Sequence, residues 1–325
     1  MKAIGLFSGG LDSTLAIKLV LDQGIEVIGL HFFSPFCTCD KKGCGINAKT
    51  IARELGISLT TQFLGEECLR IIKNPKYGYG KNLNPCIDCR ILIFKKAKEF
   101  MKKIGASFII TGEVLGQRPK SQHAHSLKTI EKEAGLEGLI LRPLSAKLIK
   151  PTIIEKNGWI DRSKLLNFWG RNRKPQIELA KVLGIKNYPS PAGGCLLTDP
   201  IFCKRVKDLL EYEIFNLKEV NLLKIGRHFR IDPSFKLIVG RDEKENNLLS
   251  QLREEKDILF EPQGKGPLGL GRGRLSKETE VLSARIISRY VSFNGKAKIK
   301  INFFSHQELL EVEKLEERLI EKFRI

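Results

Sequence analysis

The first 145 residues alternate between short apolar runs and segments whose apolar positions recur with helical spacing. Strands are predicted over residues 3–7, 26–32, 58–63 and 108–111, and helices over 13–23, 47–55 and 91–104. Strands that alternate with helices predict an α/β fold: a parallel sheet with helices on both faces. In such sheets ligands bind beyond the carboxyl ends of the strands.

The pattern changes beyond about residue 205. A strand is predicted over 235–239, a helix over 243–252, then a mixed helix and strand, and a charged helix from His306. The glycine-rich stretch 263–274 is either a flexible loop or an RNA-contacting loop beside its basic residues. We therefore predict two domains, an α/β domain over 1–205 and a smaller α+β domain over 206–325.

The net charge of the chain indicates what kind of partner it binds. The 325-residue chain is 42% hydrophobic and 29% charged, which suits a globular protein, and its net charge is +19. Residues 1–225 carry +15 of that excess, concentrated in 90–103 and 162–186. Either run alone could be a solvated helix face, but two in one domain favour binding to a nucleic-acid backbone.

The composition also excludes several classes of protein. Eight cysteines in 325 residues are too few for a disulfide-stapled scaffold. Gly9, Gly10 and Asp12 interrupt the only early apolar run, so no leader is predicted, and no run is long enough to span a membrane. We expect a cytoplasmic protein with no membrane partner, whose cysteines have another role.

The segment 7–14 carries the strongest local signal, because it follows a strand and opens a helix. Gly9 and Gly10 allow amide groups to approach phosphate oxygens, and Ser13 with the helix N-terminus adds donors. Asp12 would repel a bare anion but suits a Mg²⁺ ion that bridges phosphates. The alternative is an ordinary glycine turn with a capping residue.

This loop lacks the Walker A pattern and resembles the SGGxDS signature of PP-loop ATP pyrophosphatases. The resemblance implies cleavage of ATP between its α- and β-phosphates and activation of a carbonyl oxygen as its adenylate. Enzymes with several different substrates share this signature. The expected nucleotide-binding residues are Ser8, Gly9, Gly10, Asp12, Ser13, Thr14, His31 and Gly112.

Three cysteines select among these enzymes. Cys86 and Cys89 form a C-x-x-C motif, and Cys195 follows two glycines. Three thiolates do not complete a structural zinc site, but they suit a four-iron four-sulfur cluster with one iron open. A redox pair at Cys86 and Cys89, a persulfide on Cys195, and inert thiols remain alternatives.

The phosphate loop, the NPCxxC segment and the later GGC together resemble sulfur-inserting tRNA modification enzymes, related to ThiI and more loosely to MnmA-type 2-thiouridylases. The resemblance covers roughly residues 1–205 and includes 77–81, 111–119, 141–147 and 170–176. The stretch 239–247 resembles the RNA-binding module NFACT-R. No THUMP-type region or rhodanese tail is apparent, so RNA recognition is expected to fall to the basic patches and the C-terminal domain.

The resemblance implies an ATP-dependent tRNA sulfurtransferase, with 4-thiouridine favoured over 2-thiouridine as product. Its cofactors would be ATP, Mg²⁺ and a 4Fe-4S cluster, and its partners tRNA and a sulfide or persulfide donor. The catalytic set is Asp12, Cys86, Cys89 and Cys195, and the three cysteines are the metal ligands. The expected RNA contacts are Arg118, Lys147, Arg171, Arg173, Lys174 and Arg241.

Two other functions fit the same sequence. One is a persulfide-relay 2-thiouridylase without a cluster, and the other is a non-catalytic, ATP-sensing RNA-binding protein. Cys37, Cys39 and Cys44 could bind a metal with His31, although an exposed loop fits their spacing better. Cys68 is expected in the core. The sequence leaves open the modified uridine, the sulfur donor and the oligomeric state, a homodimer included.

Overall fold

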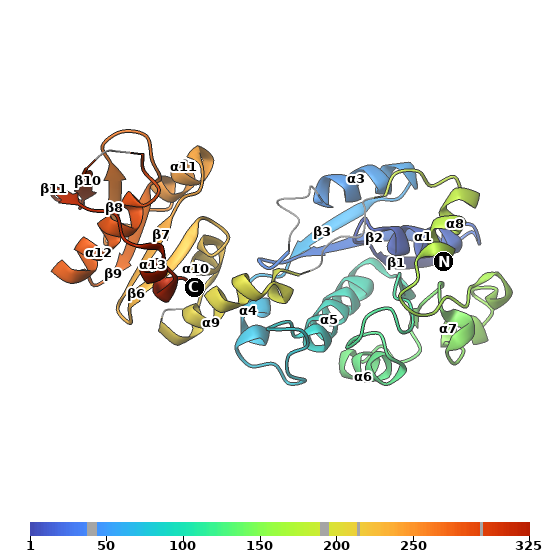
Figure 1. Ribbon diagram of the computed structural model, residues 1–325. Helices are drawn as coiled ribbons and strands as arrows, with labels where there is room; N and C mark the ends of the chain where they lie inside the picture. Colours follow the sequence, from blue (N-terminus) through green and yellow to red (C-terminus); the bar gives the residue numbers. More distant parts are fainter. Residues whose placement is uncertain (38–43, 189–194, 213–214, 293–294) are drawn as a thin grey trace. The chain divides into compact units, whose positions relative to one another are not determined.

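The computed structural model divides into two compact units, Met1–Thr198 and Asp199–Ile325. It describes residues 1–37, 44–188, 195–212, 215–292 and 295–325. Each unit has its own sheet and its own hydrophobic core (Figure 1). In these described ranges no helix is both long and apolar enough to cross a membrane.

The first unit is built on a parallel sheet with the strand order β3-β2-β1-β4-β5. The strands are β1 (Lys2–Leu6), β2 (Glu26–Phe33), β3 (Leu59–Phe63), β4 (Phe108–Thr111) and β5 (Ile140–Leu141). Ala3 of β1 aligns with Val27 on one side and with Phe108 on the other. The chain therefore leaves β1 in one direction and returns on its other side, which creates a switch point between β1 and β4.

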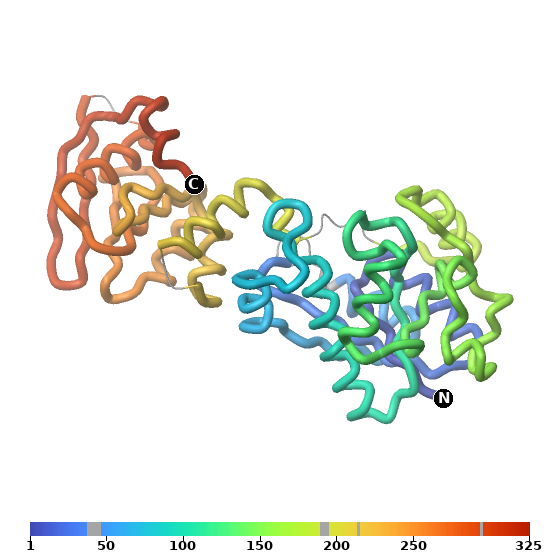
Figure 2. The backbone as a smooth tube through the Cα atoms, turned by 90° about the horizontal axis from the view of Figure 1, so that it is seen from below, coloured from blue at the N-terminus to red at the C-terminus, as the bar shows by residue number. Residues whose placement is uncertain are grey.

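Helices cover both faces of this sheet (Figures 1 and 2). They are α1 (Leu11–Leu21), α3 (Cys44–Glu54), α4 (Glu66–Lys73), α5 (Cys86–Ile104), α6 (Ala124–Ala134), α7 (Ile153–Lys156) and α8 (Lys174–Val182). Ala3 packs with α1, α3 and α8, whereas the next residue, Ile4, packs with α5 and α6. This alternation buries both faces of the strand and confirms the predicted α/β fold.

The second unit has an antiparallel sheet with the order β11-β10-β8-β9-β7-β6. Its strands are β6 (Arg227–Asp232), β7 (Phe235–Val239), β8 (Ile258–Pro262), β9 (Gly269–Gly273), β10 (Ala297–Asn302) and β11 (Gln307–Val312). Its helices are α9 (Pro200–Tyr212), α10 (Leu217–Leu222), α11 (Glu243–Gln251), α12 (Lys277–Ser288) and α13 (Glu317–Phe323). One core joins α12 and α13 to the sheet, and a second core joins α10 and α11 to it. The expected α+β character is confirmed.

The predicted C-terminal helix from His306 is wrong. The segment begins with the edge strand β11, which pairs with β10 from Gln307 opposite Asn302, and only α13 is helical. Most of β11 is exposed, because it lies at the edge of the sheet. Charged residues on a solvated edge strand resemble those on a solvated helix, and this is why the pattern misled.

The glycine-rich stretch is also better ordered than a flexible loop, because it contains strand β9. A Cβ atom on Gly271 would lie 2.5 Å from the ring of Phe235, and one on Gly269 would lie 2.4 Å from Ile287 of α12. These glycines therefore let helix and aromatic side chains pack directly on the strand. Arg272 of β9, a candidate RNA contact, forms ion pairs with Asp257 and other carboxylates of its own unit.

Gly273→Ala tests the packing of β9. Gly273 has φ +112°, and an added Cβ would lie 2.0 Å from the carbonyl oxygen of Ser234, so backbone must move. Gly158→Ala is the control, because Gly158 also has a positive φ (+67°) but no atom within 4 Å of the added Cβ. We expect a loss of roughly 3 kcal/mol or more for Gly273→Ala and about 1 kcal/mol for Gly158→Ala in urea unfolding. Equal losses would contradict this account.

Candidate active site

A cavity of about 460 Å³ opens where β1 and β4 end, at the switch point of the first sheet. Leu6 and Phe7 bring β1 into its wall, and Thr111 and Gly112 bring in the end of β4. The topology therefore places the cavity where open α/β sheets bind their ligands.

The segment that was predicted to bind phosphate forms one wall of this cavity. Ser8, Gly10, Asp12 and Ser13 line it. The hydroxyl of Ser13 donates to the carbonyl oxygen of Gly10 (2.9 Å) and lies 3.1 Å from the hydroxyl of Ser8, which holds the turn closed. No side chain caps the N-terminus of α1. Amide groups at the start of α1 are thus available to an anion.

The other expected nucleotide-binding residues occupy different places. Gly112 lines the cavity, and a Cβ there would lie 2.5 Å from the backbone of Asp12 and Ser13. Gly9 lies against Ala48 of α3. Thr14 and His31 are buried outside the cavity lining, where Thr14 donates to Gly10 and His31 Nδ1 lies 2.8 Å from the carbonyl oxygen of Phe7. These two side chains support the backbone of the loop.

Only one of the two carboxylate oxygens of Asp12 has a hydrogen-bond partner. Its Oδ2 accepts a hydrogen bond from Gln117 Nε2 (3.0 Å), whereas its Oδ1 is buried without a partner. An unpaired carboxylate oxygen beside an anion-binding loop suits a hard divalent cation such as Mg²⁺. Sequence reasoning gave Gln117 no role, although its place in the loop that follows β4 is a signal that could have identified it.

The cavity is strongly cationic. Four arginines line it, namely Arg90, Arg118, Arg171 and Arg173, and Asp12 is the only acidic residue among its described lining residues. Burial lowers the pKa of Arg118, and the charge of Arg90 lowers it further, while Cys86 opposes the shift. Arg118 is an exposed residue by its solvent-accessible area, so the pKa shift reflects its position on the cavity wall and not a place in the core. An anionic ligand would relieve this crowding of positive charge.

One buried carboxylate pairs with two arginines, of which Arg90 lines the cavity and Arg142 does not. Glu113 follows Gly112, and its fully buried side chain forms ion pairs with Arg142 (3.0 Å) and Arg90 (3.3 Å). Arg142 also pairs with Glu131. Burial opposes the charge on Arg142, but the two carboxylates raise its pKa above the ordinary value. Sequence reasoning missed both Glu113 and Arg90 as parts of this site.

The two cysteine segments lie close together. Cys86 and Cys89 occupy the first turn of α5. Thr198 donates through its amide (3.0 Å) and hydroxyl (2.8 Å) to the carbonyl oxygen of Cys195, and its own carbonyl oxygen accepts from Asn82 Nδ2 (2.8 Å). Cys195 is thereby tied to the loop that precedes Cys86. It also pairs with Cys37 in an isolated β-bridge at the end of β2.

The thiols of Cys86 and Cys89 are partly shielded from water. Burial raises the pKa of Cys86 and of Cys89, against the nearby charges of Arg118 and Arg90. Cys68 of α4 is buried, as expected; burial raises its pKa, and the charges of Cys89 and Cys195 add to the shift. Cys68 is thus a fourth thiol in this neighbourhood. Across the described part of the chain, no three Cys, His, Asp or Glu side chains are close enough to hold a metal ion. Cys39 and the side chain of Cys44 lie outside the described residues.

Two family models match the chain. Residues 1–161 match the family described as thiamine biosynthesis protein (ThiI), and residues 226–324 match the NFACT protein RNA binding domain. The first of these matching regions is called the ThiI domain below, and the second the NFACT-R domain. Both predicted resemblances are thereby confirmed.

Individual relatives match only part of the chain. A tRNA-specific 2-thiouridylase MnmA of Pelotomaculum thermopropionicum is 34% identical over 125 residues, which cover 34% of this chain and 34% of that protein. A probable tRNA sulfurtransferase of Thermococcus kodakarensis is 25% identical over 55% of this chain and 44% of its own length. A 4-thiouridine synthetase, in a crystal structure with RNA and bound ATP, is 24% identical with a TM-score of 0.40, over 57% of this chain and 41% of that one. This chain thus spans less than half the length of each of these proteins.

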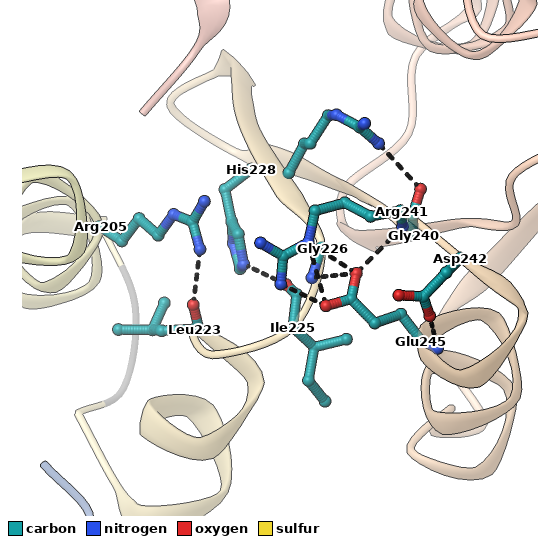
Figure 3. Close-up of polar contacts among 10 residues, drawn as sticks. Arg205, Leu223, Ile225, Gly226, His228, Gly240, Arg241, Asp242 and Glu245 are labelled. Atoms are coloured by element: carbon teal, nitrogen blue, oxygen red, sulfur yellow. Dashed lines mark hydrogen bonds and ion pairs between the residues drawn. The ribbon is translucent and has the colours of Figure 1, made fainter. Parts of the chain in front are cut away.

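The remaining predicted RNA contacts lie outside the cavity lining. In the first unit, Lys174 is exposed and Lys147 donates to the carbonyl oxygen of Ser163 (2.7 Å). In the NFACT-R domain, Arg241 forms an ion pair with Glu245 that raises its pKa (Figure 3). All three stay predictions as RNA contacts.

Arg241 lies near two other basic side chains, Arg205 and His228, to which sequence reasoning gave no role (Figure 3). Arg205 of α9 donates to the carbonyl oxygen of Leu223 (2.8 Å), and burial lowers its pKa to about 10. His228 is fully buried, and burial, together with the charges of Lys236 and Arg205, lowers its pKa well below the ordinary value. Burial thus favours the neutral form of the His228 imidazole.

Glu113→Gln tests the ion pairs of the ThiI domain. The substitution keeps the shape of the side chain but leaves the guanidinium groups of Arg142 and Arg90 without the Glu113 charge. We expect a loss of roughly 3–5 kcal/mol in the free energy of unfolding. Glu99→Gln is the control, because the Glu99 side chain is 69% exposed and forms a 3.6 Å surface pair with Lys96, and it should cost less than about 0.5 kcal/mol. Similar losses in the two variants would refute the buried role of Glu113.

Proposed function

We propose that this chain is an ATP-dependent tRNA sulfurtransferase that replaces a uridine carbonyl oxygen with sulfur. The observation that carries the proposal is the arrangement of the ThiI domain, where the phosphate loop and Asp12 line one cavity and the segment of Cys86 and Cys89 adjoins it through Arg90 and Arg118. The names of the related 2-thiouridylase and sulfurtransferase support the same chemistry. The NFACT-R domain supports an RNA substrate.

The proposed reaction has two steps. The uridine oxygen attacks the α-phosphorus of ATP, the bond to the β-phosphate oxygen breaks, and pyrophosphate leaves. Sulfide then attacks the adenylated carbon, the carbon–oxygen bond breaks, and AMP leaves with the original oxygen. Amides at the start of α1 would bind phosphate oxygens. Asp12 would hold Mg²⁺ through its unpaired Oδ1.

Cys86, Cys89 and Cys195 would hold a 4Fe-4S cluster. The type of donor fits, because thiolates are the usual ligands of such clusters and the hydrogen bond between Asn82 and Thr198 ties the two segments together. Among the described residues the three thiols are not close enough to share one metal ion, so cluster binding would bring them nearer to one another. When bound, a cluster with three protein ligands supplies one iron at which a sulfur atom can bind. The match to ThiI favours 4-thiouridine as product, and the tRNA substrate favours a cytoplasmic location.

A second mechanism uses the same cavity without a cluster. There, one cysteine carries a persulfide, whose outer sulfur attacks the adenylated carbon and displaces AMP. The thiolate of a second cysteine then attacks the inner sulfur and breaks the S–S bond, which leaves the outer sulfur on the base and a disulfide between the two cysteines. The 34% identity to a 2-thiouridylase MnmA favours this alternative. The two mechanisms differ in iron content and in the position of sulfur on the base.

Substitution of the cysteines separates these mechanisms. We expect Cys86→Ala and Cys195→Ala each to reduce thiolation of tRNA at least about 100-fold, measured anaerobically by mass spectrometry of digested nucleosides. In the cluster mechanism both variants also lose bound iron. Cys203→Ala, in α9 of the other unit, is the control and keeps activity and iron. An iron-free wild-type protein that thiolates tRNA with a persulfide donor would overturn the cluster mechanism.

Asp12→Asn tests whether ATP is cleaved or only sensed. The substitution removes the charge that would hold Mg²⁺ while keeping a side chain that Gln117 can contact. We expect loss of tRNA-dependent pyrophosphate release by at least about 100-fold, with unchanged affinity for tRNA. Wild-type protein that binds ATP and tRNA but releases no pyrophosphate would support the ATP-sensing alternative and contradict this proposal.

A further inference from the structure

Arg171 and Arg173 lie in an unexpected place. The basic run 162–186 led to the prediction that both contact the tRNA backbone. In the structure both side chains line the same cavity as Ser8, Gly10 and Asp12. Their neighbour Lys174 is exposed and does not line the cavity. The two arginines therefore differ from the adjacent Lys174 in their position, because only the arginines line the cavity.

Backbone contacts hold this pair in place. The amide of Gly170 donates to the carbonyl oxygen of Leu115 (2.8 Å), and Trp169 pairs with Leu115 in an isolated parallel bridge. Leu115 belongs to the same loop as Gln117, which hydrogen-bonds Asp12. After Arg173 the chain enters α8, which packs against α1, the helix that starts at the phosphate loop. Both ends of the short segment are thus fixed relative to the phosphate loop.

The two guanidinium groups are not engaged within the protein. Neither Arg171 nor Arg173 has a side-chain hydrogen bond or an ion pair with another described residue, and the Nε of Arg173 is buried without a partner. A buried donor without an acceptor is costly, so this one calls for a ligand. Arginine presents parallel N–H groups that match two oxygens of one phosphate.

We propose that Arg171 and Arg173 bind the β- and γ-phosphates of ATP and stabilise pyrophosphate as it leaves. The inference rests on the ATP cleavage proposed above. When the bond between the α-phosphorus and its bridging oxygen breaks, negative charge develops on the β-phosphate. Fixed cations at that position stabilise the developing charge, together with the amides at the start of α1.

The test measures nucleotide and RNA binding separately. The probe is α,β-methylene-ATP with Mg²⁺, which cannot be split at the relevant bond, and its affinity is measured by calorimetry without tRNA. We expect Arg171→Ala and Arg173→Ala each to weaken this affinity on the order of tenfold or more, and to weaken competition by inorganic pyrophosphate in parallel. Affinity for unmodified tRNA, measured without nucleotide, should stay within about twofold.

Lys174→Ala is the matched control, because it removes one positive charge from the adjacent position outside the cavity lining. It should leave nucleotide affinity unchanged. Arg173→Lys keeps the charge but not the paired donors, so it should recover only part of the affinity lost in Arg173→Ala. Because Arg171 is exposed, we expect Arg171→Ala to fold like the wild type, so a loss of nucleotide affinity in this variant is not caused by misfolding.

Three outcomes would overturn the inference. If Arg171→Ala and Arg173→Ala bind the nucleotide like the wild type but bind tRNA more weakly, the arginines are RNA contacts. If Lys174→Ala weakens nucleotide binding equally, the loss of affinity comes from removing any positive charge near the cavity and not from these two arginines. If the wild-type protein itself does not bind α,β-methylene-ATP or ATP, the ATP-dependent function fails and this inference fails with it.

Discussion

The close passage of Gly112 over the first turn of α1 is the constraint on which the site depends. No side chain separates Gly112 from the backbone of Asp12 and Ser13, so the loop after β4 lies directly against the phosphate loop. That contact brings Gln117 to Asp12 and places Arg118 on the cavity wall. Any larger residue at position 112 would separate two loops that share a single ligand-binding surface.

Glu113, the next residue, extends this constraint to the thiols. Its ion pair with Arg90 joins the loop after β4 to α5, one residue beyond Cys89. The loop and the cysteine-bearing helix are therefore positioned by one buried carboxylate. In the reaction proposed above, such a link would keep the phosphate loop and the cysteines in a fixed relation while the substrate stays bound.

The sequence predicted those parts of the structure whose signals are local. Strand–helix alternation, the glycine-rich phosphate loop and the C-x-x-C motif are each contained in a few consecutive residues, and the α/β fold follows from the first of them. The roles of Arg90, Glu113 and Gln117 could not be predicted in this way, because each acts through a residue from a distant part of the chain. In the second unit, β9 and β11 were misread because glycines and charges have the same local pattern in a loop or helix as in a closely packed or edge strand.

The position of Cys86 and Cys89 in the first turn of α5 has an electrostatic consequence. The helix is 19 residues long, and Pro85 at its start offers no capping side chain. The aligned peptide dipoles of α5 therefore direct positive potential toward the sulfur atoms of that turn, where it falls off within a short distance. Whatever anionic sulfur species occupies this place is stabilised by the backbone itself, so that part of the stabilisation persists through any substitution of the surrounding side chains.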